Sequence, residues 1–119
     1  GVETAGFIHA WNSSVAVRNA SMIRGNAEAG GAFVLESSDL EAHNLQITNC
    51  QSLTDGGAIL ANGTSTLLCS QCTLDSNVAG ARGGAISIES NETQLLAVQL
   101  TNCLIRNNTA DYGGEFSLL

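Results

Sequence analysis

Apolar and other residues alternate in the same way after each of four Gly-Gly pairs, so the chain consists of repeated units. The pairs are Gly30 and Gly31, Gly56 and Gly57, Gly83 and Gly84, and Gly113 and Gly114. The apolar positions that follow, with a degenerate first copy after position 6, form two columns: Ile8, Phe33, Ile59, Ile86 and Phe116, then Ala10, Leu35, Ala61, Ile88 and Leu118. A period of two around a variable middle position predicts a half-buried β-strand in every unit. We interpret the glycine pairs as sharp turns, because glycine permits positive φ and close backbone approach.

A second alternating segment follows in each unit. It supplies two more apolar columns: Val15, Leu40, Leu67 and Val98, then Val17, Ala42, Cys69 and Leu100. A tetrad comes next, which starts with an apolar residue and usually ends with Asn, at 23–26, 47–50, 74–77 and 105–108. Each unit is therefore predicted to contain two or three short strands separated by turns.

A unit of about 25–30 residues made of strands and turns cannot bury an apolar face alone, so neighbouring units have to stack. Like columns then lie over like columns, about 4.8 Å apart. We therefore predict an all-β fold, a right-handed parallel β-helix of four to five coils that forms one segment, 1–119. The expected coils are approximately 5–29, 30–55, 56–82, 83–112 and 113–119. Leucine-rich and helical repeats fit less well, because neither a leucine ladder nor a period of 3.6 is present.

The tetrads align Asn26, Asn77 and Asn108 in one column. Asparagine tolerates left-handed backbone, and its amide group both donates and accepts hydrogen bonds. We expect these side chains to form a structural ladder from coil to coil. Cys50 occupies the same column, and we expect the ladder to weaken there because sulfur cannot replace the amide bonds.

Two of the four cysteines, Cys72 and Cys103, share a further column with Leu45 and Ser21. The spacing between neighbouring coils brings their Cα atoms within the range for a disulfide, so this pair is the disulfide candidate. The alternative, small buried apolar side chains, stays open. No metal site is expected, because a single Cys-x-x-Cys pair has no second pair or His at zinc spacing.

Composition and charge exclude several classes of protein. The net charge is −7, with four Arg and no Lys, so no basic patch for nucleic acid can form. No apolar run approaches the ~18 residues of a membrane span, and the first residues do not resemble a signal peptide. The absence of proline suits a chain whose backbone donors are needed in every coil.

The chain contains more Asn-x-Ser/Thr sequons than chance predicts. They begin at Asn12, Asn19, Asn62, Asn91 and Asn107. Most fall at positions predicted to be solvated turns, where a eukaryotic secretory pathway would attach N-glycans. The alternative, polar turn residues without sugar, stays open. No cofactor is expected beyond such N-linked glycans.

The tetrad and the Gly-Gly motif together resemble the repeats of the chlamydial polymorphic outer-membrane proteins, which have relatives in large secreted proteins of algae and protists. The segments 74–86 and 105–114 are most similar, and the likeness extends over the whole chain. Departures are Cys50 for Asn, Glu115 for Ala, and an apolar residue other than Phe at the start of each tetrad. The resemblance implies a β-helix that serves extracellular display, adhesion or surface architecture. The sequons favour a eukaryotic relative over the bacterial adhesins.

We expect no catalytic activity. The alternative is a carbohydrate-binding or polysaccharide-degrading, pectin-lyase-like β-helix, which would need clustered carboxylates. Asp39 with Glu41, and Glu89 with Glu92, are each expected to share a solvated turn, where weak cation binding is the alternative. The two histidines are isolated in the sequence, and no Gly-x-Ser-x-Gly motif occurs.

Both ends of the sequence lack a capping element, and the last unit stops midway. Open ends of a β-helix expose unpaired backbone. We therefore expect self-association by end-to-end stacking of coils, or contact with neighbouring coils of a longer chain. Carbohydrate is a further expected partner, and the expected location is extracellular or at the cell surface.

Overall fold

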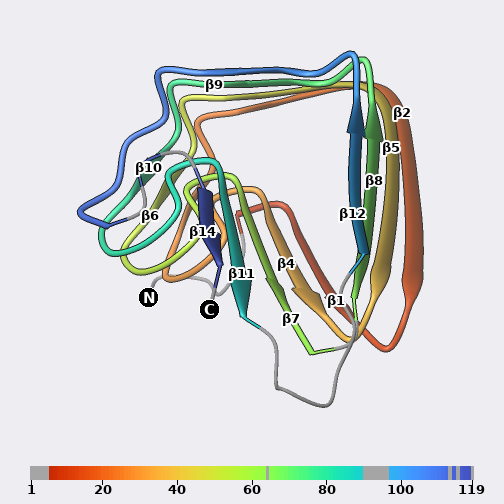
Figure 1. Ribbon diagram of the computed structural model, residues 1–119, viewed down its shortest axis with the longest axis horizontal. Coiled ribbons are helices and arrows are strands. Elements are labelled where there is room, and N and C mark those ends of the chain that lie inside the picture. Colours follow the sequence, from red (N-terminus) through yellow and green to blue (C-terminus); the bar gives the residue numbers. More distant parts are fainter. Residues whose placement is uncertain (1–5, 64, 90–96, 113, 115, 119) are drawn as a thin grey trace.

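A computed structural model describes residues 6–63, 65–89, 97–112, 114 and 116–118. These residues form parallel β-strands and contain no helix, and the strands wind into a β-solenoid (Figure 1). The strands are β1 (Ile8–Trp11), β2 (Ser14–Ile23), β3 (Asn26–Ala27), β4 (Phe33–Glu36), β5 (Asp39–Thr48), β6 (Gln51–Ser52), β7 (Ile59–Asn62), β8 (Thr66–Ser70), β9 (Thr73–Asp75), β10 (Val78–Ala79), β11 (Ile86–Glu89), β12 (Ala97–Thr101), β13 (Leu104–Arg106) and β14 (Phe116–Leu118).

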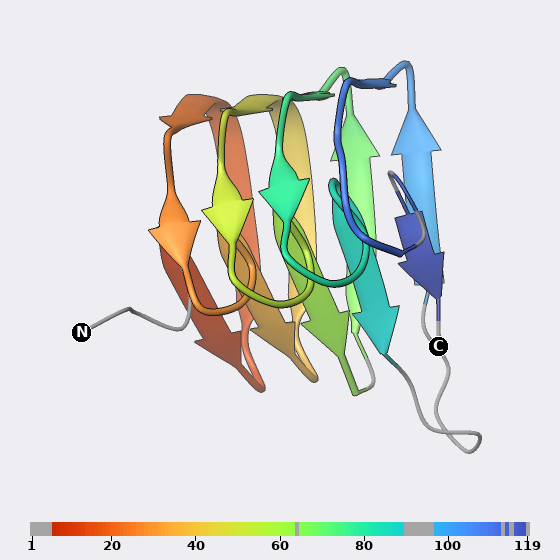
Figure 2. The same ribbon diagram turned by 90° about the vertical axis from the view of Figure 1, so that its left-hand side faces the viewer.

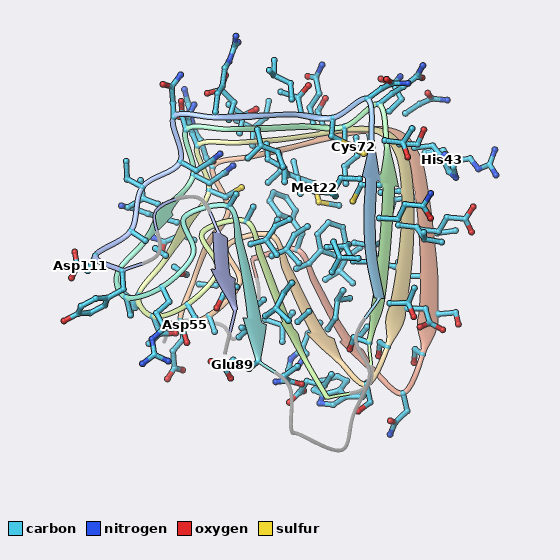
Figure 3. All side chains as sticks on the ribbon, in the orientation of Figure 1. Met22, His43, Asp55, Cys72, Glu89 and Asp111 are labelled. Atoms are coloured by element: carbon cyan, nitrogen blue, oxygen red, sulfur yellow. The ribbon has the colours of Figure 1, made fainter. Side chains whose placement is uncertain are left out.

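The strands are distributed over three parallel sheets. Sheet A has five strands in the order β1-β4-β7-β11-β14, which Figure 2 shows side by side in chain order. Sheet B has the order β12-β8-β5-β9-β13, with β2 paired to β5. Sheet C consists of β10, β6 and β3. The sheets enclose one apolar interior, into which Met22 and Cys72 point (Figure 3).

The apolar columns expected from the sequence are confirmed by the strand register. In sheet A, Ile8 pairs with Phe33, Phe33 with Ile59, and Ile59 with Ile86. In sheet B, Leu40 pairs with Leu67 at the same position in consecutive strands. Period-two alternation was sufficient here, because every second side chain has to reach the shared interior.

The middle column of sheet A differs from the expectation. Val34, Leu60 and Ser87 are 2%, 8% and 0% exposed, so these strands are covered on both faces rather than on one. Val34 and Leu60 form a small second cluster, against which Ala29 packs. The segment before β4, which contains Ala29 and Gly30, therefore folds back over the outer face of sheet A.

In the first three glycine pairs, the first glycine has a left-handed φ and the second approaches the backbone of a neighbouring coil closely. Gly56, the first of its pair, has a φ of 72°, a left-handed conformation that L-residues rarely adopt. Gly57, the second, has no such φ, but a Cβ atom there would overlap the carbonyl oxygen of Gly84 and the backbone of Val78. The first glycine is thus required for the turn, and the second for the close approach of neighbouring coils of the solenoid, which are called rungs below.

Other corners of the solenoid use left-handed residues that are not glycine. Their φ values lie between 46° and 62°. They stack in columns: Asn19, Asn44, Gln71 and Asn102; Arg24, Asn49, Ser76 and Asn107; and Asn12 with Ser37. Six of these left-handed residues are asparagines, which bend the backbone at the corners.

Candidate functional sites

Asn77 and Asn108 lie in one buried column and are hydrogen-bonded from rung to rung. The Oδ1 atom of Asn108 accepts from the backbone N–H of Asn77 at 2.9 Å and from its Nδ2 at 2.8 Å. The Nδ2 atom of each donates to a backbone carbonyl of the rung before, Ile47 for Asn77 and Leu74 for Asn108. These amides satisfy backbone groups that are buried at a corner, which is a structural role.

Cys50 fills the next position of this column and imitates the amide. Asn77 Oδ1 accepts from Cys50 N at 2.9 Å, and Cys50 Sγ in turn accepts from Gly25 N at 3.3 Å. The thiol also donates to the Met22 carbonyl at 3.7 Å, in the place where Asn77 donates to Ile47. The sulfur therefore occupies both bonding positions, which the sequence analysis had excluded, but at longer distances than the amide, in agreement with the expected weakening of the ladder.

Asn26 does not belong to this column, which corrects the alignment made from the sequence. Asn26 is exposed and pairs with Gln51 in sheet C, and Gly25 occupies the position equivalent to Cys50. The first unit is shifted by one residue, because Met22, not Ile23, pairs with Ile47 and enters the core. For the same reason Ala20 rather than Ser21 pairs with Leu45.

A serine column that the sequence analysis missed repeats the same arrangement at another corner. Ser38 Oγ accepts from Ser13 N at 3.1 Å, and Ser65 Oγ accepts from Ser38 N at 3.1 Å. Each hydroxyl donates to a carbonyl a few residues before it, Ser38 to Glu36 and Ser65 to Asn62. A serine two or three residues after the end of β1, β4 and β7 was the sequence pattern that could have indicated this column.

The thiols are free in this structure, so the candidate disulfide between Cys72 and Cys103 is not formed. Both residues nevertheless lie at the same position of neighbouring rungs, since the next residues, Thr73 and Leu104, are paired. In a parallel sheet such side chains point the same way, which leaves their Cβ atoms about 4.8 Å apart, whereas a disulfide needs about 3.5–4.5 Å. Cys69 lies beside them and is hydrogen-bonded through its thiol to Cys72.

The sequon asparagines occupy corners. Asn12, Asn19 and Asn107 are exposed and left-handed, with φ of 46°, 51° and 56°. Asn19 Oδ1 also accepts a hydrogen bond from Asn44 at 2.9 Å. Asn62 is half-buried at the end of β7. The sequon at Asn91 lies outside the described residues.

The outer face of sheet B carries two adjoining hollows of about 170 and 360 Å³. Both are lined by Glu41 and Leu68. His43, on the outside of the molecule in Figure 3, contacts Glu41 at 2.9 Å, and this hydrogen bond holds the pKa of the Glu41 carboxyl below its usual value. Asp39 and Glu41 lie on the strand β5, not in a turn as the sequence suggested.

Other polar contacts lie on the outer side of sheet A. His9 contacts the Glu36 carboxylate and stacks on Trp11, with ring centroids 3.8 Å apart, so neither histidine is isolated. Glu89 lies beside Asp55 (Figure 3). The hydrogen bond between these two carboxyls, together with burial and repulsion, raises the pKa of Glu89. Glu92 lies outside the described residues.

Among the described residues, no group of three or more His, Cys, Asp and Glu side chains is placed to hold a metal ion. The same part of the chain contains no helix with the length and apolarity that crossing a membrane requires.

Comparison with known proteins finds a bacterial relative for half of the chain. A stretch of 60 residues is 43% identical to the protein described as "Probable autotransporter YfaL" of Escherichia coli (strain K12). The stretch covers 50% of this chain and 5% of that relative. No family model matches the chain, and no solved structure matches it. The partial relative and the solenoid together fit a parallel β-helix repeat, compatible with a segment of a secreted or surface protein.

Proposed function

We propose that this chain is a structural or adhesive, non-catalytic β-helix segment of an extracellular surface or filament protein. Its repeats are of the polymorphic outer-membrane protein type, wound right-handed in four to five coils. The observation that supports this most is the register of sheet A. There, β1 and β14 each pair on one side among the described residues, while β4, β7 and β11 pair on both. An edge of this kind accepts another rung, from a longer chain or a second copy.

Sedimentation of the purified chain over a range of concentrations, with electron microscopy, tests end-to-end stacking. We expect the mass to rise with concentration and rods to form. Ile8→Lys should abolish stacking, because it puts a charge at the open end of the core, where Ile8 is half-buried. Leu53→Lys is the matched control, since Leu53 is 61% exposed. A monomer at every concentration contradicts self-stacking and leaves only neighbouring coils of a longer chain.

N-linked glycosylation at the five sequons is part of the proposal. The exposure of Asn12, Asn19 and Asn107 supports glycosylation. The similarity to a bacterial protein gives it no support. The chain secreted from a eukaryotic host should lose mass when treated with a peptide N-glycosidase. No loss of mass contradicts this part of the proposal.

A second candidate is a carbohydrate-binding or pectin-lyase-like β-helix. The adjoining hollows on sheet B favour it, because Asp39 and Glu41 line the larger one and could bond to sugar hydroxyls. A screen of acidic polysaccharides tests this candidate. Turnover of a polysaccharide would overturn the non-catalytic assignment, binding without turnover would support a carbohydrate-binding segment that is not catalytic, and the absence of both would contradict the second candidate.

A further inference from the structure

We propose that Cys72 and Cys103 form an oxidation site in which a disulfide closes between neighbouring rungs, with Cys69 as a positioning thiol. The structure shows the reduced state of this site. The proposal rests on the register of sheet B, on the exposure of the three thiols and on their contacts.

The register brings the two residues together. Leu104 N donates to the Cys72 carbonyl at 2.9 Å, and Leu104 pairs with Thr73. The Cα atoms of paired residues in neighbouring parallel strands lie about 4.8 Å apart, inside the range of about 4.4–6.8 Å found in disulfides. Closing the bond requires the Cβ atoms to approach by less than about 1 Å. The strand β13, which carries Leu104, pairs only with β9 among the described strands, so one side of it is unconstrained by the ladder.

Exposure determines which thiol reacts first. Cys50, Cys69 and Cys72 are 0%, 4% and 2% exposed, whereas Cys103 is only half-buried. An oxidant in solution therefore meets Cys103 before the others. The Cys103 thiol donates to the Cys69 carbonyl at 3.4 Å, which directs its sulfur toward the rung that carries Cys69 and Cys72.

Cys69 favours Cys72 as the second reactant. Burial raises the pKa of both thiols. The Cys69 thiol donates a hydrogen bond to the Cys72 sulfur. This bond lowers the pKa of Cys72 and raises the pKa of Cys69 further. Because the thiolate is the nucleophile, Cys72 is the more reactive of the two buried sulfurs.

The oxidation proceeds by thiol–disulfide exchange with a small disulfide such as oxidised glutathione. The Cys103 thiolate attacks one glutathione sulfur, and the other glutathione leaves as a thiolate. The Cys72 thiolate then attacks the Cys103 sulfur, which forms the Cys72–Cys103 bond and releases the second glutathione. Two protein thiols are oxidised, one disulfide is reduced, and the two protons pass to the departing thiolates.

The bond would cross-link two rungs and enclose the segment 73–102, which reduces the conformational freedom of the unfolded chain. Its use outside the cell rests on the proposed function. The chemistry itself does not, so failure of the oxidation would leave the proposed location untouched.

Tryptic mapping after oxidation of the folded chain with glutathione disulfide tests the site. With no lysine, trypsin cleaves only after Arg18, Arg24, Arg82 and Arg106. Cys103 is then in the peptide 83–106, while the other three cysteines share the peptide 25–82. We expect these two peptides to be linked, and the thermal midpoint of the oxidised chain to rise by on the order of 5 °C or more.

Serine variants of single cysteines, first confirmed as folded by their circular dichroism, assign the bond. Cys72→Ser should abolish the link between the two peptides. Cys69→Ser should retain the link but form it more slowly, and Cys50→Ser, the matched control, should behave as the parent chain. No link in the parent chain, or a link that survives in Cys72→Ser, would overturn the proposal.

Discussion

At the scale of single residues, the buried polar atoms of this solenoid differ in whether a neighbouring rung offers them a partner. Asn77 bonds to groups of two other rungs, and Ser38 bonds both to Ser13 and to Ser65. Ser52 and Ser87 are equally buried, yet their hydroxyls have no hydrogen-bond partner among the described residues. Because an unpaired buried polar group costs free energy, these two classes should respond in opposite ways to substitution.

Asn77→Ala should destabilise the fold by roughly 3 kcal/mol, because it leaves the Cys50 N–H and the Ile47 carbonyl without partners. Asn26→Ala is the matched control, since Asn26 is exposed and lies outside the column. Its unfolding free energy should change by less than about 0.5 kcal/mol. Urea unfolding measures both, and equal losses would show that the column contributes nothing specific.

Ser87→Ala and Ser52→Ala should each stabilise the fold by about 1 kcal/mol, because each removes a buried hydroxyl that has no partner. Alanine already occurs beside Ser52 in its column, at positions 27 and 79. Ser38→Ala, which deletes a bonded hydroxyl, should destabilise instead. A loss of stability in all three variants, measured by thermal unfolding, would contradict this distinction.

Glu89→Gln should raise the thermal midpoint near neutral pH. Asp55 raises the pKa of Glu89 in the folded protein above its ordinary value of 4.5. Glu89 therefore stabilises the fold below pH 4.5, where it is protonated, and this stabilisation is lost as the pH rises through the folded pKa. The advantage of the variant should therefore disappear in acid. Glu41→Gln should show the opposite sign near neutrality, because His43 lowers the pKa of Glu41. If the thermal midpoints of both variants differ from that of the parent chain by the same amount at every pH, these two pKa shifts do not affect the stability as proposed.

At the scale of elements, strands were predictable where alternation decides them, and corners were predictable mainly where glycine pairs mark them. The columns of sheet A follow from residues such as Ile59 and Ile86, whose side chains have to share one interior. The first unit was misaligned, because Ile23 suggested the start of a tetrad although Met22 enters the core. The left-handed conformation of Gln71 has no strong local signature, because glutamine rarely adopts it and the register of both flanking strands imposes it.

Gly57→Ala should cost more than about 3 kcal/mol or prevent folding, because the new methyl group would overlap the backbone of the next rung. Gly114→Ala is the control that isolates backbone strain. Gly114 has a φ of 53°, but no atom lies within 4 Å of the place that an added methyl group would take, so the cost should stay at about 1–2 kcal/mol. If Gly57→Ala costs no more than Gly114→Ala in chemical denaturation, the close approach of neighbouring rungs does not require the second glycine.

At the scale of the whole molecule, the pattern of rungs predicted the architecture, while the candidate sites were predicted only in part. Asn77, Asn108, Cys72 and Cys103 fall where the columns place them, since register converts sequence spacing into proximity. The contacts of His9 with Glu36 and of Asp55 with Glu89 were not foreseen, because they join different rungs on the outer surface, where no periodic pattern operates.

Backbone amides in β7 should exchange with deuterium more slowly than those in β1, by on the order of tenfold or more. The reason is that β7 lies between β4 and β11, whereas β1 pairs only with β4 among the described strands. Neighbouring rungs dominate the stability of solenoids. Hydrogen exchange followed by mass spectrometry at low protein concentration, where stacking is minimal, measures the ratio. Uniform protection would indicate one cooperative unit without fraying ends.

The buried Asn column keeps its bonds although the rungs differ in length. Successive members bond across sequence separations of 25, 27 and 31 residues, at 3.3, 2.9 and 2.9 Å. Extra residues are therefore accommodated away from the column, and in the last interval they fall between β11 and β12. A foreign peptide, such as an epitope or an affinity tag, inserted between these two strands should therefore leave the bonds of the column intact. The same tolerance allows residues to be inserted between two rungs while the register of the remaining rungs stays unchanged.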